Sequence, residues 1–225
     1  MGFSFCFLYF YINILLGSDY VKRVLCFGDS NTWGYIPGSN GQRYSNRWTR
    51  VLKDLLGPNY EVIEEGLNSR TLTSIYFDPL KKGKTGYNYL LPCMESHNKF
   101  DVFVLMLGTN ELKNFFNNSP EDILDMIKKF IEIISNFMLL DGTYPRLIVS
   151  SIPLVDDREL PNDDIFSNTK KKSEEYCQLL KSYCENLDIE YLDNTDLKVG
   201  IDGIHLTEKS HYTLATRLNK MIKEQ

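Results

Sequence analysis

Two kinds of apolar pattern alternate along the chain from residue 21 onward. Short runs that are apolar nearly throughout, as expected of buried strands, occupy residues 24–27, 60–63, 102–107, 147–150 and 189–192. Longer segments with apolar residues at helical spacing occupy residues 47–56, 89–97, 120–138, 169–186 and 207–223. Apolar strands separated by helices predict a parallel sheet with both faces covered. We therefore expect a three-layer α/β/α sandwich with a five-stranded parallel sheet.

The start of the third predicted helix is the boundary with the clearest signals. Ser119 can cap the helix, and Pro120 suits the first helical position, where its missing N–H costs no hydrogen bond. Glu121 and Asp122 place negative charge near the positive end of the helix dipole. The sequence therefore predicts a helix that begins at residue 120.

Composition limits the number of domains and the class of partner. The chain has 225 residues, of which 43% are hydrophobic, so a single globular domain over residues 21–225 is the simplest organisation. The net charge is -5, and basic residues are interleaved with acids; even the run 170–172 is followed by Glu174 and Glu175. Nucleic-acid binding proteins usually carry a basic stripe instead, so we expect no nucleic-acid partner.

Cysteine usage and the first residues bear on where the protein resides. The five cysteines include no C-x-x-C pair, which argues against a disulfide framework and a zinc site and favours the cytoplasm. Residues 1–20 form a separate apolar extension. We interpret it first as translated upstream sequence, second as an export signal or membrane anchor, and third as an added helix. An anchor would bring the protein to a membrane; otherwise no membrane partner is expected.

Small polar residues follow the predicted strands, where parallel sheets bind their ligands. These polar blocks are residues 28–31, 64–70, 108–111, 151–153 and, before the last helix, 202–205. Each block alone is typical of a turn or a helix cap. Together they supply a serine, a histidine, a carboxylate and amide donors, which are the groups that serine hydrolysis requires.

Four of these blocks resemble, in order, the conserved blocks of the SGNH (GDSL) hydrolase superfamily. The blocks begin at Gly28-Asp29-Ser30, Gly66, Gly108-Thr109-Asn110 and Asp202-Gly203-Ile204-His205. Within the superfamily, the stretches RVLCFGDSNTWG, VIEEGLNSRT, MLGTNE and DGIHLT are similar to the bacterial arylesterase and acyltransferase branch that includes the mycobacterial acyltransferase/perhydrolase. The resemblance implies the flavodoxin-like fold of these hydrolases and a serine esterase for short-chain aryl or alkyl esters, which also transfers acyl groups to alcohols or peroxide.

The resemblance also implies a role for individual residues. Ser30 is the expected nucleophile, His205 the general base and acid, and Asp202 the carboxylate that orients His205. The oxyanion hole is expected from the backbone N–H groups of Ser30 and Gly66 and the side-chain amide of Asn110. No metal or cofactor is implied. The expected substrate-binding residues, chosen because they adjoin these blocks, are Asn31, Trp33, Tyr35, Leu67, Asn68 and Ile204.

Two positions depart from the family pattern. Glu111 stands where the third block usually has Asp, and Tyr35 stands where the branch tends to have Trp. The longer acid at position 111 bears on how Asn110 is held, and Tyr35 bears on the acyl pocket. We expect His97 and His211 to be structural. Asp193 and Asp196 are rival carboxylates, but neither has the three-residue spacing that lets a carboxylate reach the His205 imidazole.

Other functions stay open at this point. A carbohydrate O-deacetylase would use Asn31, Asn68 and the polar loop 156–164 to contact sugar hydroxyls. A non-catalytic binding protein on the same fold would follow if Glu111 inactivates the site. A nucleotide-binding domain is disfavoured because no Gly-x-Gly-x-x-Gly or Walker pattern follows the first strand. The aromatic-rich composition and the resemblance also predict a homo-oligomer.

Overall fold

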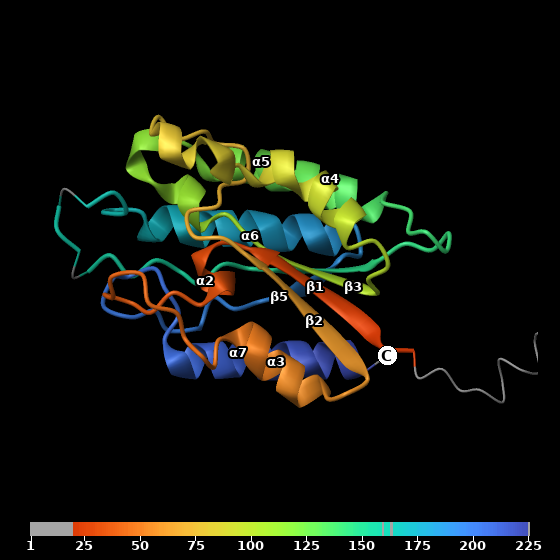
Figure 1. Cartoon of the computed structure of the whole chain (residues 1–225). Helices are drawn as coiled ribbons and strands as arrows, with labels where there is room; N and C mark the ends of the chain where they lie inside the picture. The colour runs from red at the N-terminus through yellow and green to blue at the C-terminus, as the bar shows by residue number, and fades with distance from the viewer. Residues whose placement is uncertain (1–19, 159, 163, 225) are drawn as a thin grey trace, which may run out of the picture.

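The structure is a computed structural model that describes residues 20–158, 160–162 and 164–224. Its centre is a five-stranded, all-parallel sheet with the strand order β2-β1-β3-β4-β5 (Figure 1). The strands are β1 Lys22–Gly28, β2 Tyr60–Gly66, β3 Val102–Met106, β4 Arg146–Ser150 and β5 Glu190–Leu192. This sheet confirms the predicted fold class, since each predicted apolar run contributes one strand.

Helices cover both faces of the sheet. The α-helices are α2 Ser30–Trp33, α3 Trp48–Leu56, α4 Gly86–Ser96, α5 Pro120–Ser135, α6 Lys170–Asn186 and α7 Glu208–Lys223. The described part of the chain also forms three 3-10 helices in the connections: η1 Pro79–Lys84, η2 Thr109–Leu112 and η3 Asn114–Phe116. Helices α4, α5 and α6 lie over one face, and α3 and α7 pack together over the other (Figure 1).

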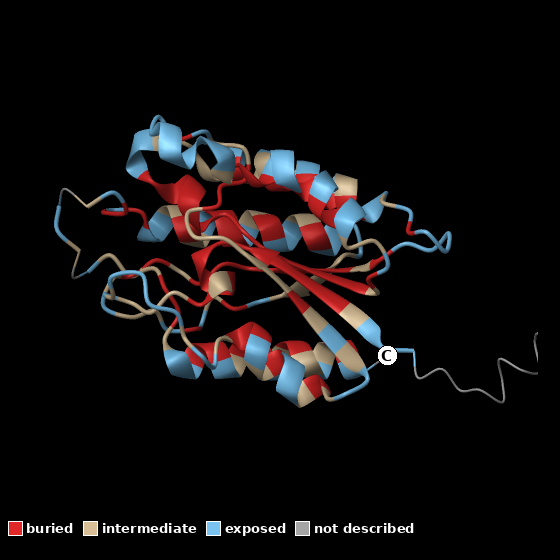
Figure 2. Ribbon diagram, in the orientation of Figure 1, coloured by how far each residue is buried: buried red, intermediate tan, exposed pale blue. Residues whose placement is uncertain are grey.

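The alternation of side chains along the strands divides the core into two layers. In β1, Leu25 and Phe27 pack under α4, α5 and α6, whereas Val24 and Cys26 pack under α3 and α7. Successive side chains of a strand point to opposite faces, so a strand that is covered on both sides must be apolar at every position. Figure 2 shows this burial along the strands and on the sheet-facing sides of the helices.

The helix boundaries differ from the predictions only in detail. Helix α5 begins at Pro120 as predicted, but it ends at Ser135 rather than at residue 138, with Asn136 as its C-cap. Helix α4 begins at Gly86, three residues before the predicted start, and continues through Pro92. The short helices α2, η1, η2 and η3 were not predicted, because segments of three to six residues are too short to show a helical period.

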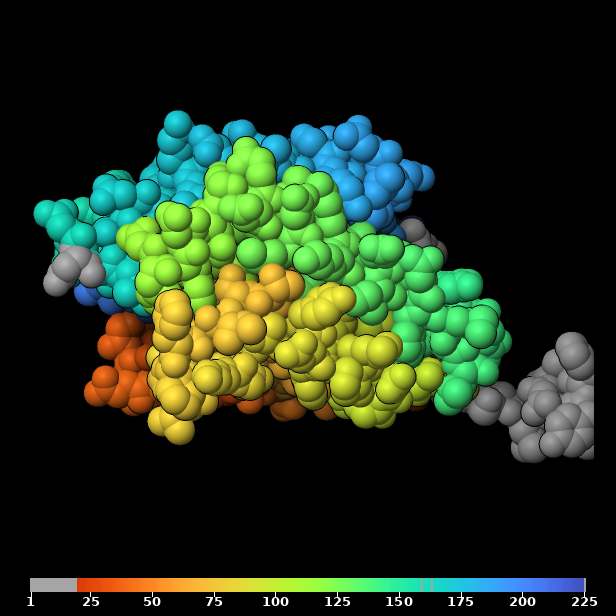
Figure 3. Space-filling view, turned by 90° about the horizontal axis from the view of Figure 1, so that it is seen from above, coloured from red at the N-terminus to blue at the C-terminus, as the bar shows by residue number. Residues whose placement is uncertain are grey.

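Several large apolar side chains lie in solvent on the face that carries α4 and α5. Ile75 is 61% exposed, Phe77 85% and Leu80 91%. Figure 3 looks onto this face, where residues 75–84 (yellow) lie beside the chain of α4. The structure contains a single chain and so does not test whether this face contacts another subunit. The expected homo-oligomer therefore stays a prediction.

Of the N-terminal extension, residues 1–20, the structure describes only residue 20. Residues 1–19 lie outside the described residues, so the three interpretations of this segment, and the domain limits drawn from them, stay predictions. Among residues 20–224, leaving out 159 and 163, no helix has both the length and the apolar character needed to cross a bilayer.

Removal of the cap of α5 tests its contribution to stability. The Ser119 hydroxyl accepts the Asp122 N–H at 3.1 Å, and the Asp122 carboxylate accepts the Ser119 N–H at 2.8 Å, which completes a capping box. Ser119→Ala should lower the free energy of unfolding by about 1 kcal/mol in urea titrations. Ser182→Ala, at an exposed position of α6, is the control and should have little effect; equal changes in both would contradict a capping role.

Candidate active site

A tight turn carries Ser30 at the carboxyl end of β1. The strand ends at Gly28, where a Cβ atom would lie 2.1 Å from Thr32 Oγ1, so only glycine fits. The Asp29 carboxylate accepts the Asn31 N–H at 2.9 Å and caps the short helix α2, which ends at Gly34 in the left-handed conformation. Ser30 is 7% exposed. The turn therefore fixes a nearly buried serine at the end of a central strand.

His205 and Asp202 reach this serine from the loop before α7. His205 Nε2 lies 2.8 Å from Ser30 Oγ, and His205 Nδ1 lies 2.7 Å from Asp202 Oδ2. When Nδ1–H donates to the carboxylate, Nε2 of the neutral ring is free to accept the serine proton. The structure thus brings together the three residues expected as the triad, with the hydrogen bonds that proton transfer requires.

The Asp202 carboxylate is held by its own loop. One oxygen accepts the backbone N–H groups of Ile204 at 3.3 Å and His205 at 3.1 Å, and the other accepts the Gly38 N–H at 3.3 Å. Burial raises the pKa of Asp202, but hydrogen bonds from the His205 ring and backbone and from the Ile204 backbone outweigh it and leave the pKa below its ordinary value. The carboxylate therefore stays ionised beside the imidazole.

The Asn31 side chain joins the serine turn to the histidine loop. Its Nδ2 donates to the Ile204 carbonyl at 3.1 Å, and its Oδ1 accepts the Leu206 N–H at 2.9 Å. Asn31 is 1% exposed. The expected contact of Asn31 with substrate stays a prediction; in the structure its amide is buried and hydrogen-bonded to the backbone on either side of His205.

Gly66 and Asn110, the other expected oxyanion residues, lie at the ends of the strands flanking β1. A Cβ on Gly66 would lie 2.3 Å from the Trp33 backbone nitrogen, so this glycine packs directly against the turn after Ser30. Asn110, 5% exposed, follows β3 in η2 and donates through Nδ2 to the Arg70 carbonyl at 3.0 Å. An amide nitrogen has two N–H groups, so this bond leaves one donor for a ligand.

A buried polar layer lies behind Asn110. The Tyr76 hydroxyl lies 3.4 Å from Asn110 Oδ1 and accepts from Lys113 Nζ at 2.8 Å. Burial lowers the pKa of Lys113 to about 8, and it raises the pKa of Asp29. Sequence reasoning missed Tyr76 and Lys113, because a lysine that is 7% exposed has no distinctive pattern around it.

Glu111 holds the neighbouring loop instead of disrupting the site. One of its oxygens accepts the Leu72 N–H at 2.6 Å, and the side chain is fully buried. Burial raises the pKa of Glu111 to about 8, and the nearby Asp29 carboxylate adds to the shift. At neutral pH, Glu111 is therefore mostly protonated, and it stays bonded to the segment that follows Arg70.

The remaining expected substrate residues are all partly buried. Trp33, Tyr35, Leu67, Asn68 and Ile204 each have intermediate exposure. The Tyr35 ring stacks on the His205 imidazole with a centroid separation of 4.5 Å, and Trp33 lies 6.3 Å from Tyr35. Their contact with a substrate stays a prediction.

The residues set aside as triad candidates have other partners. The buried His211 ring accepts the Trp48 N–H at 3.3 Å, and burial lowers its pKa to about 3. Asp196 pairs with Arg217 at 2.6 Å, and Asp193 accepts from Thr195 and lies 3.5 Å from Lys181. His97 bonds to a glutamate of β2.

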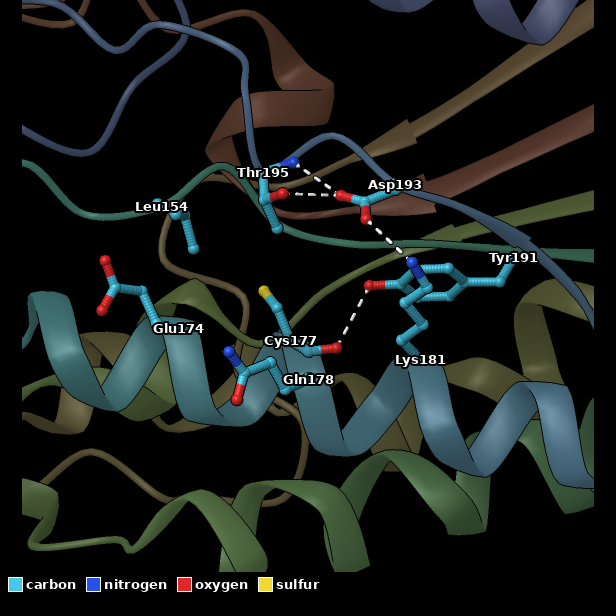
Figure 4. Close-up of a pocket in the computed structure, with 8 residues that line it drawn as sticks. All are labelled: Leu154, Glu174, Cys177, Gln178, Lys181, Tyr191, Asp193 and Thr195. Atoms are coloured by element: carbon cyan, nitrogen blue, oxygen red, sulfur yellow. Dashed lines mark hydrogen bonds and ion pairs between the residues drawn. The ribbon is translucent and has the colours of Figure 1, made fainter.

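A hollow of about 250 Å³ lies between α6 and the chain around β5, and no triad residue lines it. Figure 4 shows Lys181 meeting Asp193 across it and the Tyr191 hydroxyl bonded to the Cys177 carbonyl. It is lined by Leu154, Glu174, Cys177, Gln178, Lys181, Tyr191, Asp193 and Thr195. The hollow is therefore separate from the serine site.

The protonation of Glu111 predicts a pH-dependent stability. Its pKa rises from 4.5 to about 8 on folding, so its stabilising contribution is complete below pH 4.5 and is lost as pH rises through 8. Relative to wild type, Glu111→Gln should gain unfolding free energy between pH 5.5 and 7.5 by about 1 kcal/mol per pH unit in urea titrations. The control, the exposed helix variant Glu132→Gln, should follow wild type; a parallel curve for Glu111→Gln would mean that Glu111 is ionised in the fold.

Several solved structures are similar to this chain over most of its length. The aryl esterase of M. smegmatis is 32% identical and superposes with a TM-score of 0.81, covering 90% of this chain and 98% of its own. Est24, a carbohydrate acetylesterase from Sinorhizobium meliloti, is 32% identical with a TM-score of 0.79, covering 89% and 98%. The lipase/acylhydrolase from Enterococcus faecalis, at 18% identity with a TM-score of 0.66 and 90% and 95% coverage, shares the fold.

The family assignment rests on most of the chain. No curated protein matches the sequence. The family model described as GDSL-like lipase/acylhydrolase matches residues 24–218, which include every block from the serine turn to the histidine loop. The chain therefore belongs to the GDSL-like lipase/acylhydrolase family, the SGNH hydrolases.

Proposed function

We propose that the protein is a serine esterase that hydrolyses short-chain carboxylic esters through an acyl-enzyme. One observation carries the proposal: the hydrogen bonds run without interruption from Ser30 Oγ through the His205 ring to the Asp202 carboxylate, at 2.8 and 2.7 Å. Such a chain activates a hydroxyl that is otherwise a weak nucleophile. The similarity to the aryl esterase of M. smegmatis supports the same reaction class.

The first half-reaction forms the acyl-enzyme. Ser30 Oγ attacks the ester carbonyl carbon while its proton passes to His205 Nε2, and Asp202 stabilises the resulting imidazolium. The negative charge on the carbonyl oxygen is accepted by the Ser30 and Gly66 N–H groups and the free N–H of Asn110. When the tetrahedral intermediate collapses, the C–O bond to the alcohol breaks and His205 returns the proton to the leaving oxygen.

The second half-reaction releases the acid. A water molecule attacks the acyl carbonyl, His205 takes its proton, and the bond to Ser30 Oγ breaks as His205 reprotonates that oxygen. An alcohol or hydrogen peroxide in place of water would give a new ester or a peracid. The partly buried Trp33, Tyr35 and Leu67 support an apolar pocket for a short acyl chain or an aryl group.

A second candidate function is a carbohydrate O-deacetylase, which would use the same triad. The similarity to the carbohydrate acetylesterase Est24 favours it. So does a polar groove of about 650 Å³ that includes Asp156, Arg158 and Lys198. This groove joins the histidine loop, because the Asp156 N–H donates to the Gly203 carbonyl at 2.8 Å. Of the loop 156–164, residues 159 and 163 lie outside the described residues.

Replacement of the serine tests the nucleophile. Ser30→Ala should reduce kcat for p-nitrophenyl acetate by at least about 1,000-fold, because among the described residues no other hydroxyl is bonded to the His205 imidazole. Ser182→Ala, at an exposed serine of α6, should keep full activity, and circular dichroism should show that both variants are folded. Equal activity in folded Ser30→Ala and wild type would refute the proposed nucleophile. No activity in any of the three proteins would favour a non-catalytic binding protein.

A comparison of substrates separates the two candidate functions. We expect phenyl acetate to exceed acetylated xylose in kcat/KM by at least about tenfold, because the aromatic side chains beside His205 favour an apolar alcohol over a hydrated sugar. Lys198→Ala, in the polar groove, should leave the rate with phenyl acetate unchanged. The opposite preference, together with a loss of sugar ester turnover in Lys198→Ala, would identify the carbohydrate O-deacetylase.

A further inference from the structure

Three side chains of metal-binding type converge on the face of the sheet under α4. Glu65 lies in β2, and Cys93 and His97 lie in and at the end of α4. One ligand atom from each lies within 4.8 Å of the others, and His97 Nε2 is 2.9 Å from Glu65 Oε1. Residues four apart in a helix share one face, so the spacing Cys93-x-x-x-His97 directs both side chains toward the strand.

The donor set fits a divalent metal of intermediate softness. Thiolate, imidazole and carboxylate are the three ligand types that zinc uses in proteins, at metal–ligand distances of roughly 2.0–2.3 Å. The three ligand atoms lie within 4.8 Å of one another, so they are grouped closely enough to surround one ion. Sequence reasoning excluded zinc because it looked for paired cysteines, whereas this set has one cysteine and joins residues 65 and 97 through the fold.

The surroundings hold the ligands while leaving access from solvent. Cys93 is fully buried, but the side chains of His97 and Glu65 are 29% and 16% exposed. The other Glu65 oxygen lies 3.9 Å from Arg70 Nη2, and the Tyr89 hydroxyl donates to Glu65 Oε1 at 3.4 Å. Bonds from a second layer of side chains to a ligating carboxylate are usual in metal sites.

The charges around the cluster are compatible with a cation. The Arg70 guanidinium pairs with Glu65 at 3.9 Å and is also held on other sides, because it stacks 4.1 Å from the Phe27 ring centroid and donates to the Gly28 carbonyl at 3.1 Å. A divalent ion bound by the Glu65 carboxylate and a Cys93 thiolate forms a neutral unit, since the imidazole of His97 adds no charge. The Arg70 guanidinium is therefore not repelled by a net positive charge at the metal site.

We propose that Glu65, Cys93 and His97 bind one zinc-class divalent cation. On binding, the Cys93 S–H bond breaks, its proton goes to the buffer, and a metal–sulfur bond forms, while Glu65 and His97 contribute lone pairs. The ion links the edge strand β2 to α4, so bound metal stabilises the folded chain. The site contains none of the triad residues, and the inference is independent of the proposed esterase activity.

Cobalt binding tests the proposal directly, because a Co²⁺–thiolate bond gives a near-ultraviolet charge-transfer band. The full-length protein, freed of metal with a chelator and kept reduced, should bind one Co²⁺ per chain with this band, and Zn²⁺ should displace it. Cys93→Ser should abolish the band and weaken Zn²⁺ binding at least about tenfold in equilibrium dialysis. His97→Gln, at a partly exposed helix end, should weaken binding similarly.

Matched variants separate this site from other metal contacts. Cys177→Ser replaces another buried cysteine under the same face of the sheet, and Glu61→Gln replaces an exposed acid on the same strand; both should bind like wild type. The absence of a band and of bound Zn²⁺ in wild type would overturn the proposal, as would a band that persists in folded Cys93→Ser. If Cys93→Ser does not fold, unchanged binding by His97→Gln overturns it.

Discussion

The site depends on the two hydrogen bonds by which Asn31 holds the loop before α7. Ser30 and His205 are 175 residues apart, and the His205 ring can meet Ser30 only if its loop lies in one place. Asn31 contacts the backbone on both sides of His205, through the Ile204 carbonyl and the Leu206 N–H. Asn31, the residue after Ser30, therefore positions the loop that carries His205. The positions of the nucleophile and of the base both depend on this residue.

The Asn31 backbone is itself held by residues that belong to the turn after β1 and to the core. The Asp29 carboxylate fixes the Asn31 N–H, and the Trp48 indole donates to the Asn31 carbonyl at 3.1 Å. Trp48 begins α3 and belongs to the core beneath α3 and α7. A buried carboxylate is costly unless it is hydrogen-bonded, and the Asp29 carboxylate offsets part of this cost by accepting the Asn31 N–H. Asn31 thus connects the turn after β1, the first residue of α3 and the loop before α7.

The sequence predicted the sheet and the convergence of polar blocks for physical reasons. Strands covered on both faces must be apolar, which makes them visible, and parallel strands direct their carboxyl ends to one edge. Hydrogen-bond partners that lie far apart in the sequence could not be predicted. Nothing near Asn31 indicates that its amide is bonded to residues 204 and 206, and nothing near Lys113 indicates burial against Tyr76. Helix α5 ends before the apolar residues 137–139, which lie in the following loop, where Leu139 is buried and Met138 is 61% exposed; the apolar pattern alone does not distinguish this loop from another helical turn.

Glu111, which stands where the family pattern usually has Asp, takes part in the contacts that hold the loop after β2. Glu111 reaches across to the Leu72 N–H, and its neighbour Asn110 donates to the Arg70 carbonyl, so two consecutive side chains of η2 bind the same short segment. That segment continues the chain from Gly66. The parts of the proposed oxyanion hole at the ends of β2 and β3 are thereby tied together, and the longer acid makes this link by accepting the Leu72 N–H. A substitution that looks disruptive in sequence is thus compatible with an intact site.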